Sequence, residues 1–189
     1  ERCLEPSLYC KKVLTAFIKL ATNFKQASYP VQIKFNTGLN RLGFKAEDIP
    51  DISSDLNNTN AVKVRSVFSH LAASEDLNQM SFTEKQIASF KELAAVFSKK
   101  INHQPWLHLC NTSGVINFPE AHFNMVRCGI GLYGFGNTPT EDKNLIPIAS
   151  LKSVISQIHQ INKGESVGYN RAFIAENHVR TATIPIGHA

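Results

Sequence analysis

The sequence predicts an α/β fold built on a parallel sheet, followed by the start of an all-β domain. Strand-like and helix-like patterns alternate along the first two thirds of the chain, which is typical of βαβ units. Polar side chains such as His70 and Asn111 come at the ends of the expected strands. After Gly136 the helical patterns stop, and short β-type runs replace them.

Four strands are expected in the α/β part. Pro30 opens the first, over residues 31–35, where polar and apolar side chains alternate. The others are expected over residues 62–71, 106–110 and 125–128. Because the carboxyl ends of parallel strands meet at one edge of a sheet or barrel, a functional site is expected at that edge.

Two helices are expected between these strands. Residues 11–24 place their apolar side chains on one helical face. A longer amphipathic helix is expected to begin at Ser81, because Ser81-Phe82-Thr83-Glu84 fits a capping box. In that motif the serine oxygen accepts from a backbone N–H, and the glutamate reaches back to the first residue.

The chain is expected to divide at a polar, turn-rich segment. Residues 1–136 carry the alternating patterns, and residues 137–148 are the expected linker. Residues 149–189 are the expected beginning of a β-strand-rich domain, with β-type runs over 149–161 and 180–186.

Composition excludes several classes of protein. The 189 residues are 43% hydrophobic and 19% charged, which suits a folded core. The net charge of +5 is modest and spread along the chain, so no nucleic-acid partner is expected. The longest apolar runs are too short for a membrane span, so none is expected. The four cysteines form no Cys-x-x-Cys pair, which argues against a disulfide framework or a metal site and favours the cytoplasm. Buried thiols that fill core space are the simplest interpretation.

Individual candidate residues each have an ordinary explanation. A lysine such as Lys34 on a strand is usually solvated, and a lone histidine such as His70 is usually a core residue with a satisfied hydrogen bond. Arg127 lies in an apolar run, where a buried guanidinium needs a partner. The glycine-rich stretch 129–136 has exposed N–H groups that suit a phosphate, and a turn leading out of the domain is the alternative.

In combination these stretches resemble the motifs of alanine racemases. Residues 34–43, Lys-Phe-Asn-Thr-Gly-Leu-Asn-Arg-Leu-Gly, resemble the family's Lys-x-Asp-Thr-Gly-Met-x-Arg-Leu-Gly. Residues 68–72 resemble its Thr-His-Phe-Ala strand end, and residues 108–113 resemble His-x-Ala-Asn-Ser. Residues 123–134 match Phe-Asn-Met-Val-Arg-x-Gly-Ile-x-Met-Tyr-Gly at nearly every position.

The resemblance continues past the expected linker. Residues 164–169 resemble Gly-Glu-x-Val-Ser-Tyr, at the head of the family's β domain, and residues 184–189 resemble the start of Ile-Pro-Ile-Gly-Tyr-Ala-Asp-Gly. The family binds pyridoxal 5'-phosphate in a TIM barrel and interconverts L- and D-alanine. A complete barrel takes about 250 residues. The resemblance therefore implies a partial TIM barrel, its second half, followed by the beginning of the β domain.

The resemblance assigns catalytic roles to three residues. Arg127 meets the pyridine nitrogen of the cofactor and leaves that nitrogen unprotonated, because a guanidinium keeps its protons. His70 lies between Arg127 and Tyr169 in a hydrogen-bond network. Tyr169 is the base on the L-alanine side, and it acts across the interface of a homodimer.

Further binding residues follow from the same resemblance. Thr112 and the N–H groups of Gly129 and Ile130 hold the phosphate, and His108 and Asn111 belong to the same wall of the site.

Arg41 receives the carboxylate of the substrate alanine. Lys34 occupies the position of a lysine that is often carbamylated, and a carbamate can fix Arg41 through a charge-assisted hydrogen bond. Asn36 stands where the family has Asp, and His188, where the family has Tyr, is given no role.

The family's Schiff-base lysine, in a Val-Val-Lys-Ala-Asn-Ala-Tyr-Gly motif, has no counterpart in this sequence. The chain begins at Glu1 rather than Met and ends within an expected strand, so we expect an inactive fragment of a longer racemase that supplies D-alanine for peptidoglycan. Fusion of that racemase to a cell-wall ligase is one possibility. The alternatives are a non-catalytic pyridoxal-phosphate-binding barrel protein and a degenerate racemase-like module that has kept only the fold.

Overall fold

A computed structural model describes residues 4–187. The chain separates into two compact units, Glu1–Ile148 and Ala149–Ala189, which are described one at a time. His188 and Ala189, which end the last motif, lie outside the described residues.

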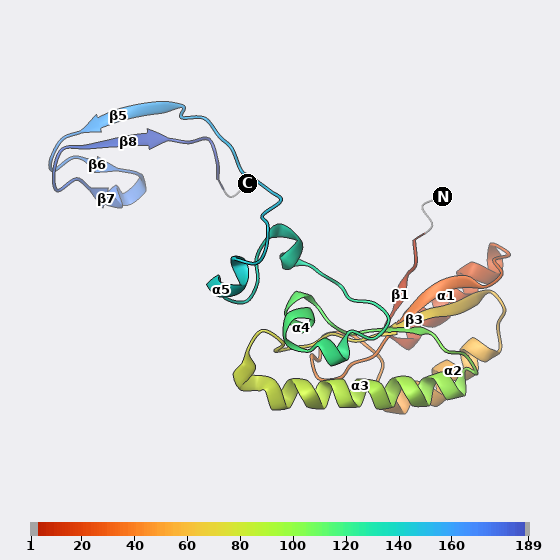
Figure 1. The fold of residues 1–189 in the computed structure, drawn as a ribbon. Helices are drawn as coiled ribbons and strands as arrows, with labels where there is room; N and C mark the ends of the chain where they lie inside the picture. Colours follow the sequence, from red (N-terminus) through yellow and green to blue (C-terminus); the bar gives the residue numbers. More distant parts are fainter. Residues whose placement is uncertain (1–3, 188–189) are drawn as a thin grey trace. The chain divides into compact units, whose positions relative to one another are not determined.

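The first unit is built on a parallel sheet of four strands in the order β1-β2-β3-β4. Figure 1 labels two of them, β1 and β3. The strands are β1 (Ser7–Leu8), β2 (Tyr29–Lys34), β3 (Val62–Phe68) and β4 (Trp106–His108). The helices between them are α1 (Lys11–Asn23), α2 (Ile49–Asn57) and α3 (Met80–Lys100). Each strand is thus followed by a helix that leads to the next parallel strand, which confirms the predicted α/β fold.

One face of the sheet forms the hydrophobic core with the helices. Val31, Ile33 and Phe35 are all 0% exposed and belong to the same buried cluster as Ile52 of α2 and Phe90 of α3. Because strand side chains alternate, the residues between them point to the opposite face. We call that opposite face the site face, and it bears Gln32, Lys34, Ser66, Phe68 and His108.

A β-bulge in β3 determines which side chains reach the site face. Val31 pairs with Val64, but Gln32 pairs with Ser66, so Arg65 is an extra residue without a partner on β2. The extra residue reverses the alternation. Val64 on one side of the bulge therefore faces the core, and Ser66 on the other side turns to the site face.

The long helix starts one residue earlier than expected. Helix α3 begins at Met80 rather than Ser81, and no side-chain cap bond is present at its N-terminus. The 3-10 turn Leu77–Gln79 leads directly into this helix, and the carboxylate of Asp76 accepts from the N–H of Asn78 to cap that turn. The predicted capping box at Ser81 is wrong because the preceding turn starts the helix earlier.

The expected strand over residues 125–128 is also wrong, because only a single parallel bridge forms there, between His108 and Met125. The backbone N–H of Leu107 donates instead to the side-chain oxygen of Asn124, at 2.9 Å, and this interrupts the ladder. The second and third strands end sooner than expected, at Phe68 and His108.

A short helix, α4 (Thr112–Asn117), follows the fourth strand, and α5 (Pro139–Asp142) is a helical turn near the end of the first unit. The described residues include no helix that is both long enough and apolar enough to cross a membrane.

The second unit consists of two small antiparallel pairs. Strand β5 (Gln157–Ile161) pairs with β8 (Val179–Thr183), and β6 (Ser166–Val167) pairs with β7 (Phe173–Ile174). Residues 149–156 form no strand, so the strand expected over residues 149–161 begins only at Gln157.

Candidate functional site

Arg127 is the centre of a polar cluster at the carboxyl end of the parallel sheet. Its Nη1 donates to Nδ1 of His108 at 2.6 Å, and its Nη2 lies 3.2 Å from Nδ1 of His70. Nη2 also donates to the backbone oxygens of Ser69, at 2.7 Å, and Leu109, at 3.0 Å. All of these acceptors are neutral, so the guanidinium charge is solvated by dipoles rather than by a carboxylate.

Two N–H groups of Arg127 remain for a ligand. A guanidinium carries five N–H donors. Among the described residues, no hydrogen bond uses its Nε–H, and Nη1 makes only the bond to His108. The side chain is half-buried, with its guanidinium 5.3 Å from the ring centroid of Phe68. The remaining donors suit an unprotonated nitrogen or oxygen of a bound molecule.

Both histidines of the cluster are neutral near pH 7. Burial and the adjacent Arg127 cation lower the pKa of His108 to about 4. The pKa of His70 is also lowered, first by burial and then by the Arg127, Arg41 and Lys34 charges. Because each ring is uncharged, its Nδ1 can accept from the guanidinium.

Lys34 lies on the site face and is buried rather than solvated, with 9% of its surface exposed. Its Nζ lies 5.8 Å from the ring centroid of Phe68. Burial lowers the pKa of this lysine, and the Arg41 and Arg127 charges lower it further. Arg41 itself is exposed, on the loop that follows β2.

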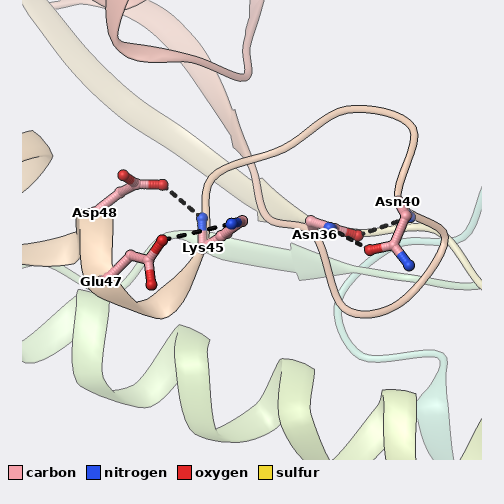
Figure 2. Close-up of polar contacts among 5 residues, drawn as sticks. All are labelled: Asn36, Asn40, Lys45, Glu47 and Asp48. Atoms are coloured by element: carbon pink, nitrogen blue, oxygen red, sulfur yellow. Dashed lines mark hydrogen bonds and ion pairs between the residues drawn. The ribbon is translucent and has the colours of Figure 1, made fainter.

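The loop that carries Arg41 is closed by the side chain of Asn36 (Figure 2). The Asn36 Oδ1 accepts from the N–H groups of Gly38, at 3.1 Å, and Asn40, at 3.0 Å. Its Nδ2 donates to Oδ1 of Asn40 at 2.8 Å. An aspartate offers only acceptors, so Asn36 supplies the two turn bonds of an aspartate and adds a third.

At the far end of the same loop, Lys45 stabilises the turn into α2. Its backbone N–H donates to a carboxylate oxygen of Asp48 at 2.7 Å, and its Nζ lies 3.5 Å from Oε1 of Glu47 (Figure 2). The loop is therefore held at both ends by local side-chain bonds.

A buried glutamine joins the loops that follow β2 and β3. Gln86 of α3 is 2% exposed; its Nε2 donates to the backbone oxygen of Thr37 at 3.1 Å, and its Oε1 accepts from the N–H of Ala72 at 2.9 Å. Ser69 adds a second connection, because its Oγ lies 2.8 Å from both the Phe35 oxygen and Oγ1 of Thr37. The Arg41 loop and the His70 loop are thus fixed to each other.

Thr112 and two glycines form a cradle of amide groups. Oγ1 of Thr112 accepts from the N–H groups of Gly129, at 2.9 Å, and Gly131, at 3.1 Å. A Cβ atom on Gly131 would lie 2.7 Å from Cγ2 of Thr112, so the approach requires glycine there. Ile130 lies between them and is 53% exposed. Because the two glycine amides donate to Thr112, the groups that suit an anionic oxygen here are the hydroxyl proton of Thr112 and the amide of Ile130.

The remaining candidate residues occupy different settings. Asn111 is the N-cap of α4, and its Oδ1 accepts from the N–H of Gly114 and from Oγ of Ser74, both at 2.9 Å. It therefore shapes the turn beside Thr112. Tyr169 belongs to the second unit and is 99% exposed there. The structure thus brings Lys34, His70, His108 and Arg127 together in one unit, whereas Tyr169 lies in the other.

The cysteines differ from one another. Cys110 is buried, and burial raises the pKa of its thiol to about 11, which makes it unreactive near neutral pH. Cys128, next to Arg127 in sequence, is exposed, so the buried-thiol interpretation does not apply to it. Among residues 4–187, no group of three or more candidate ligands is placed to hold a metal ion.

Sequence reasoning did not find four residues that support the site. These are Ser66, Ser69, Gln86 and Gly131. A buried serine or glutamine gives no pattern in a single sequence, since its role depends on which strand or loop packs beside it. Gly131 could have been found by its place in the glycine-rich stretch.

Comparisons with known proteins show the family and the fold of the chain. The profile described as "Alanine racemase, N-terminal domain" matches residues 1–137, and "Alanine racemase, C-terminal domain" matches residues 148–189. The alanine racemase of Treponema denticola is 29% identical over 98% of this chain and 50% of its own length. That of Psychrobacter sp. is 33% identical over 84% of this chain and 42% of its own length. The chain spans about half the length of the curated relatives it matches.

Solved structures show the same fold. The biosynthetic alanine racemase of Pseudomonas aeruginosa is 28% identical over 96% of this chain and 49% of its own, with a TM-score of 0.79. The alanine racemase of Streptomyces coelicolor reaches a TM-score of 0.87 over 97% of this chain and 50% of its own, at 23% identity. The fold thus defines the class of protein: a barrel followed by a β-rich domain, of which this chain spans about half. The chain belongs to the alanine racemase family.

Proposed function

We propose that this chain is part of a pyridoxal-phosphate-dependent racemase that interconverts L- and D-alanine. One observation carries the proposal. At the same end of the sheet, the half-buried Arg127 has unused N–H donors, and Thr112 forms the amide cradle with Gly129 and Gly131. The match of residues 148–189 to the family's C-terminal domain favours a racemase over a barrel protein that only binds the cofactor. A related structure, from Bartonella henselae, holds covalently bound pyridoxal phosphate.

The residues present fit this cofactor. Thr112 and the amide of Ile130 would hold the phosphate, the N–H of Gly129 would turn to it from the oxygen of Thr112, and Gly131 would keep the backbone close to the threonine. Arg127 would donate to the ring nitrogen through a free N–H. When bound, pyridoxal phosphate makes the α-proton of an amino acid acidic enough for a protein base to remove.

The chain's own residues then have distinct tasks. Arg127 stays protonated, because a guanidinium does not give up its proton in a protein, so it would donate a hydrogen bond to the ring nitrogen of the cofactor without transferring a proton to it. His70 holds Nη2 of Arg127 from one side. Arg41 would receive the carboxylate of the substrate, and Tyr169, acting in a homodimer on the partner's site, would exchange the α-proton on the L-alanine face.

We further propose that the 189-residue chain alone does not racemise alanine, because it lacks the lysine motif that anchors the cofactor. The assay is formation of D-alanine from L-alanine with added pyridoxal phosphate, and measurable turnover by this chain overturns the proposal. In a protein that carries this chain together with the anchoring lysine, Tyr169→Phe should slow proton removal from L-alanine more than from D-alanine. Equal losses in both directions contradict the role of Tyr169.

Cofactor binding can be tested with the chain as it stands. Thr112→Val keeps the side-chain shape but removes the hydroxyl from the amide cradle, so binding of pyridoxal phosphate should weaken about tenfold, the effect of a lost hydrogen bond to a charged group. The measurement is a fluorescence titration with pyridoxal phosphate.

Thr22→Val is the matched control, because the Thr22 hydroxyl donates within α1 to the oxygen of Ile18. Equal affinities of the Thr112→Val and Thr22→Val chains would count against the phosphate site. No binding by the wild-type chain would count against the proposed cofactor.

Carbamylation of Lys34 is a second expected property. An uncharged amine adds carbon dioxide to give a carbamate and releases one proton, and the lowered pKa of Lys34 increases the uncharged fraction. With 13C-labelled bicarbonate, NMR should show a carbamate carbon whose signal grows as the pH rises. Lys34→Gln should remove the signal, and Lys63→Gln, which changes an exposed lysine, should keep it. A signal that survives Lys34→Gln assigns the carbamate elsewhere.

A further inference from the structure

A buried serine lies behind the arginine of the candidate site. Ser66 is 1% exposed, and its Oγ lies 3.1 Å from Nε2 of His108. The other ring nitrogen, Nδ1, lies 2.6 Å from Nη1 of Arg127. The imidazole of His108 is itself 1% exposed, so it connects a serine hydroxyl to the guanidinium away from water.

The proton of this imidazole has one consistent position. Arginine has only donors, so Nδ1 of His108 accepts from Nη1 and carries no proton. A neutral imidazole then has its proton on Nε2, and the partner of that N–H is Oγ of Ser66. With the opposite tautomer, an N–H would face the N–H of Arg127, and Nε2 would be left as an acceptor.

The surrounding residues hold the ring in this orientation. Phe68 stacks on His108, with ring centroids 4.8 Å apart and planes 4° from parallel. The bulge at Arg65 turns Ser66 onto the same face as the imidazole. Arg127 is the charged group that faces the ring.

We infer that Ser66 is a positioning residue for Arg127, acting through the tautomer of His108. By accepting from Nε2–H, the serine keeps Nδ1 free to hold the guanidinium. The inference rests on the proposed function in one respect, that Arg127 is the group that meets the cofactor ring. The statement about the tautomer stands on the geometry alone.

The test is a long-range 1H–15N correlation spectrum of the full 15N-labelled chain. The shifts of the two ring nitrogens distinguish the Nε2–H tautomer from the Nδ1–H tautomer, and His108→Gln identifies the signals. We expect the wild-type chain to populate the Nε2–H tautomer. Ser66→Ala should lower the ratio of Nε2–H to Nδ1–H about tenfold, because the buried N–H loses its acceptor. Ser66→Thr, which restores a hydroxyl, should restore the ratio.

Ser53→Ala is the matched control. Ser53 is 3% exposed, and its Oγ has no hydrogen-bond partner among residues 4–187, so its removal should leave the His108 signals unchanged. An unchanged tautomer ratio in Ser66→Ala overturns the inference. If Ser66→Ala does not fold, the tautomer ratio is measured in Ser66→Cys, whose sulfur accepts hydrogen bonds only weakly. A lowered ratio again supports the inference, and an unchanged ratio overturns it.

A second readout separates this inference from the proposed function. In a chain that binds pyridoxal phosphate, Ser66→Ala should weaken binding about fivefold relative to Ser53→Ala. A shifted tautomer ratio with unchanged affinity overturns the positioning role. Absence of binding by the wild-type chain is a failure of the proposed function, and the tautomer ratio then decides the statement about Ser66 by itself.

Discussion

Replacing Gly43 by alanine should destabilise the first unit by about 3 kcal/mol or more. Gly43 has a φ of +133°, a conformation that side-chain-bearing residues rarely adopt. A Cβ atom there would lie 2.5 Å from the backbone nitrogen of Asn36 and 2.6 Å from the carbonyl carbon of Phe35. Backbone strain of this kind costs about 1–3 kcal/mol, and contact with a rigid backbone adds to it.

The strain from this substitution would arise where the Arg41 loop returns to the sheet. Phe44 makes a parallel bridge to Phe35, with its N–H donating to the oxygen of Lys34 and its oxygen accepting from the N–H of Asn36, both at 2.8 Å. Urea denaturation followed by Trp106 fluorescence measures the loss. Gly187→Ala is the control for stability, because a Cβ at this exposed glycine of the second unit meets no described atom within 4 Å. Similar stabilities of the two variants would show that the loop adjusts without cost.

Acid should weaken the first unit by about 3 kcal/mol through His108 alone. The pKa of this histidine is about 4 in the folded chain, against 6.5 for an ordinary histidine. Between these values the unfolded chain binds a proton that the folded chain does not. Stability is therefore complete above pH 6.5 and is lost as the pH falls from 6.5 towards 4. His70, whose pKa is also lowered, acts in the same direction.

The measurement is the free energy of unfolding in urea at pH 7, 5.5 and 4. His108→Gln should be less stable at pH 7, because it disturbs the bond to Arg127, yet its stability should fall less as the pH is lowered. His178→Gln, which changes an exposed histidine of the second unit, should leave the pH dependence as it is. Parallel curves for the wild-type and His108→Gln chains would show that His108 does not cause the acid loss.

The part of the site that could be predicted is the part that lies at strand ends. Lys34, His70 and His108 each follow or end a strand, and strands in parallel register bring their ends to one edge. The short motifs around these residues were enough to place them together. Arg127 was expected on a fourth strand; the structure brings it to the same edge without one, through a bond from its N–H to the oxygen of Cys110 at 2.9 Å.

The part that could not be predicted depends on side chains far apart in the sequence. Gln86 reaches Thr37 across 49 residues, and Ser66 reaches His108 across 42. Both are buried polar residues that look unremarkable in their own helix or strand. The burial of Lys34 belongs to the same class, since it follows from Phe68 on the neighbouring strand.

The bulge at Arg65 decides which side chains of β3 support the site. If the strand kept its length and paired regularly beyond Val64, Arg65 would pair with Gln32 and Ser66 with Ile33. Ser66 and Phe68 would then turn from the site into the core, and Val67 would turn from the core to the site. Deleting Arg65 would instead leave these three side chains on their present faces, because Ser66 would directly follow Val64. The support of His108 therefore depends on Arg65 being left out of the pairing, and not on its side chain.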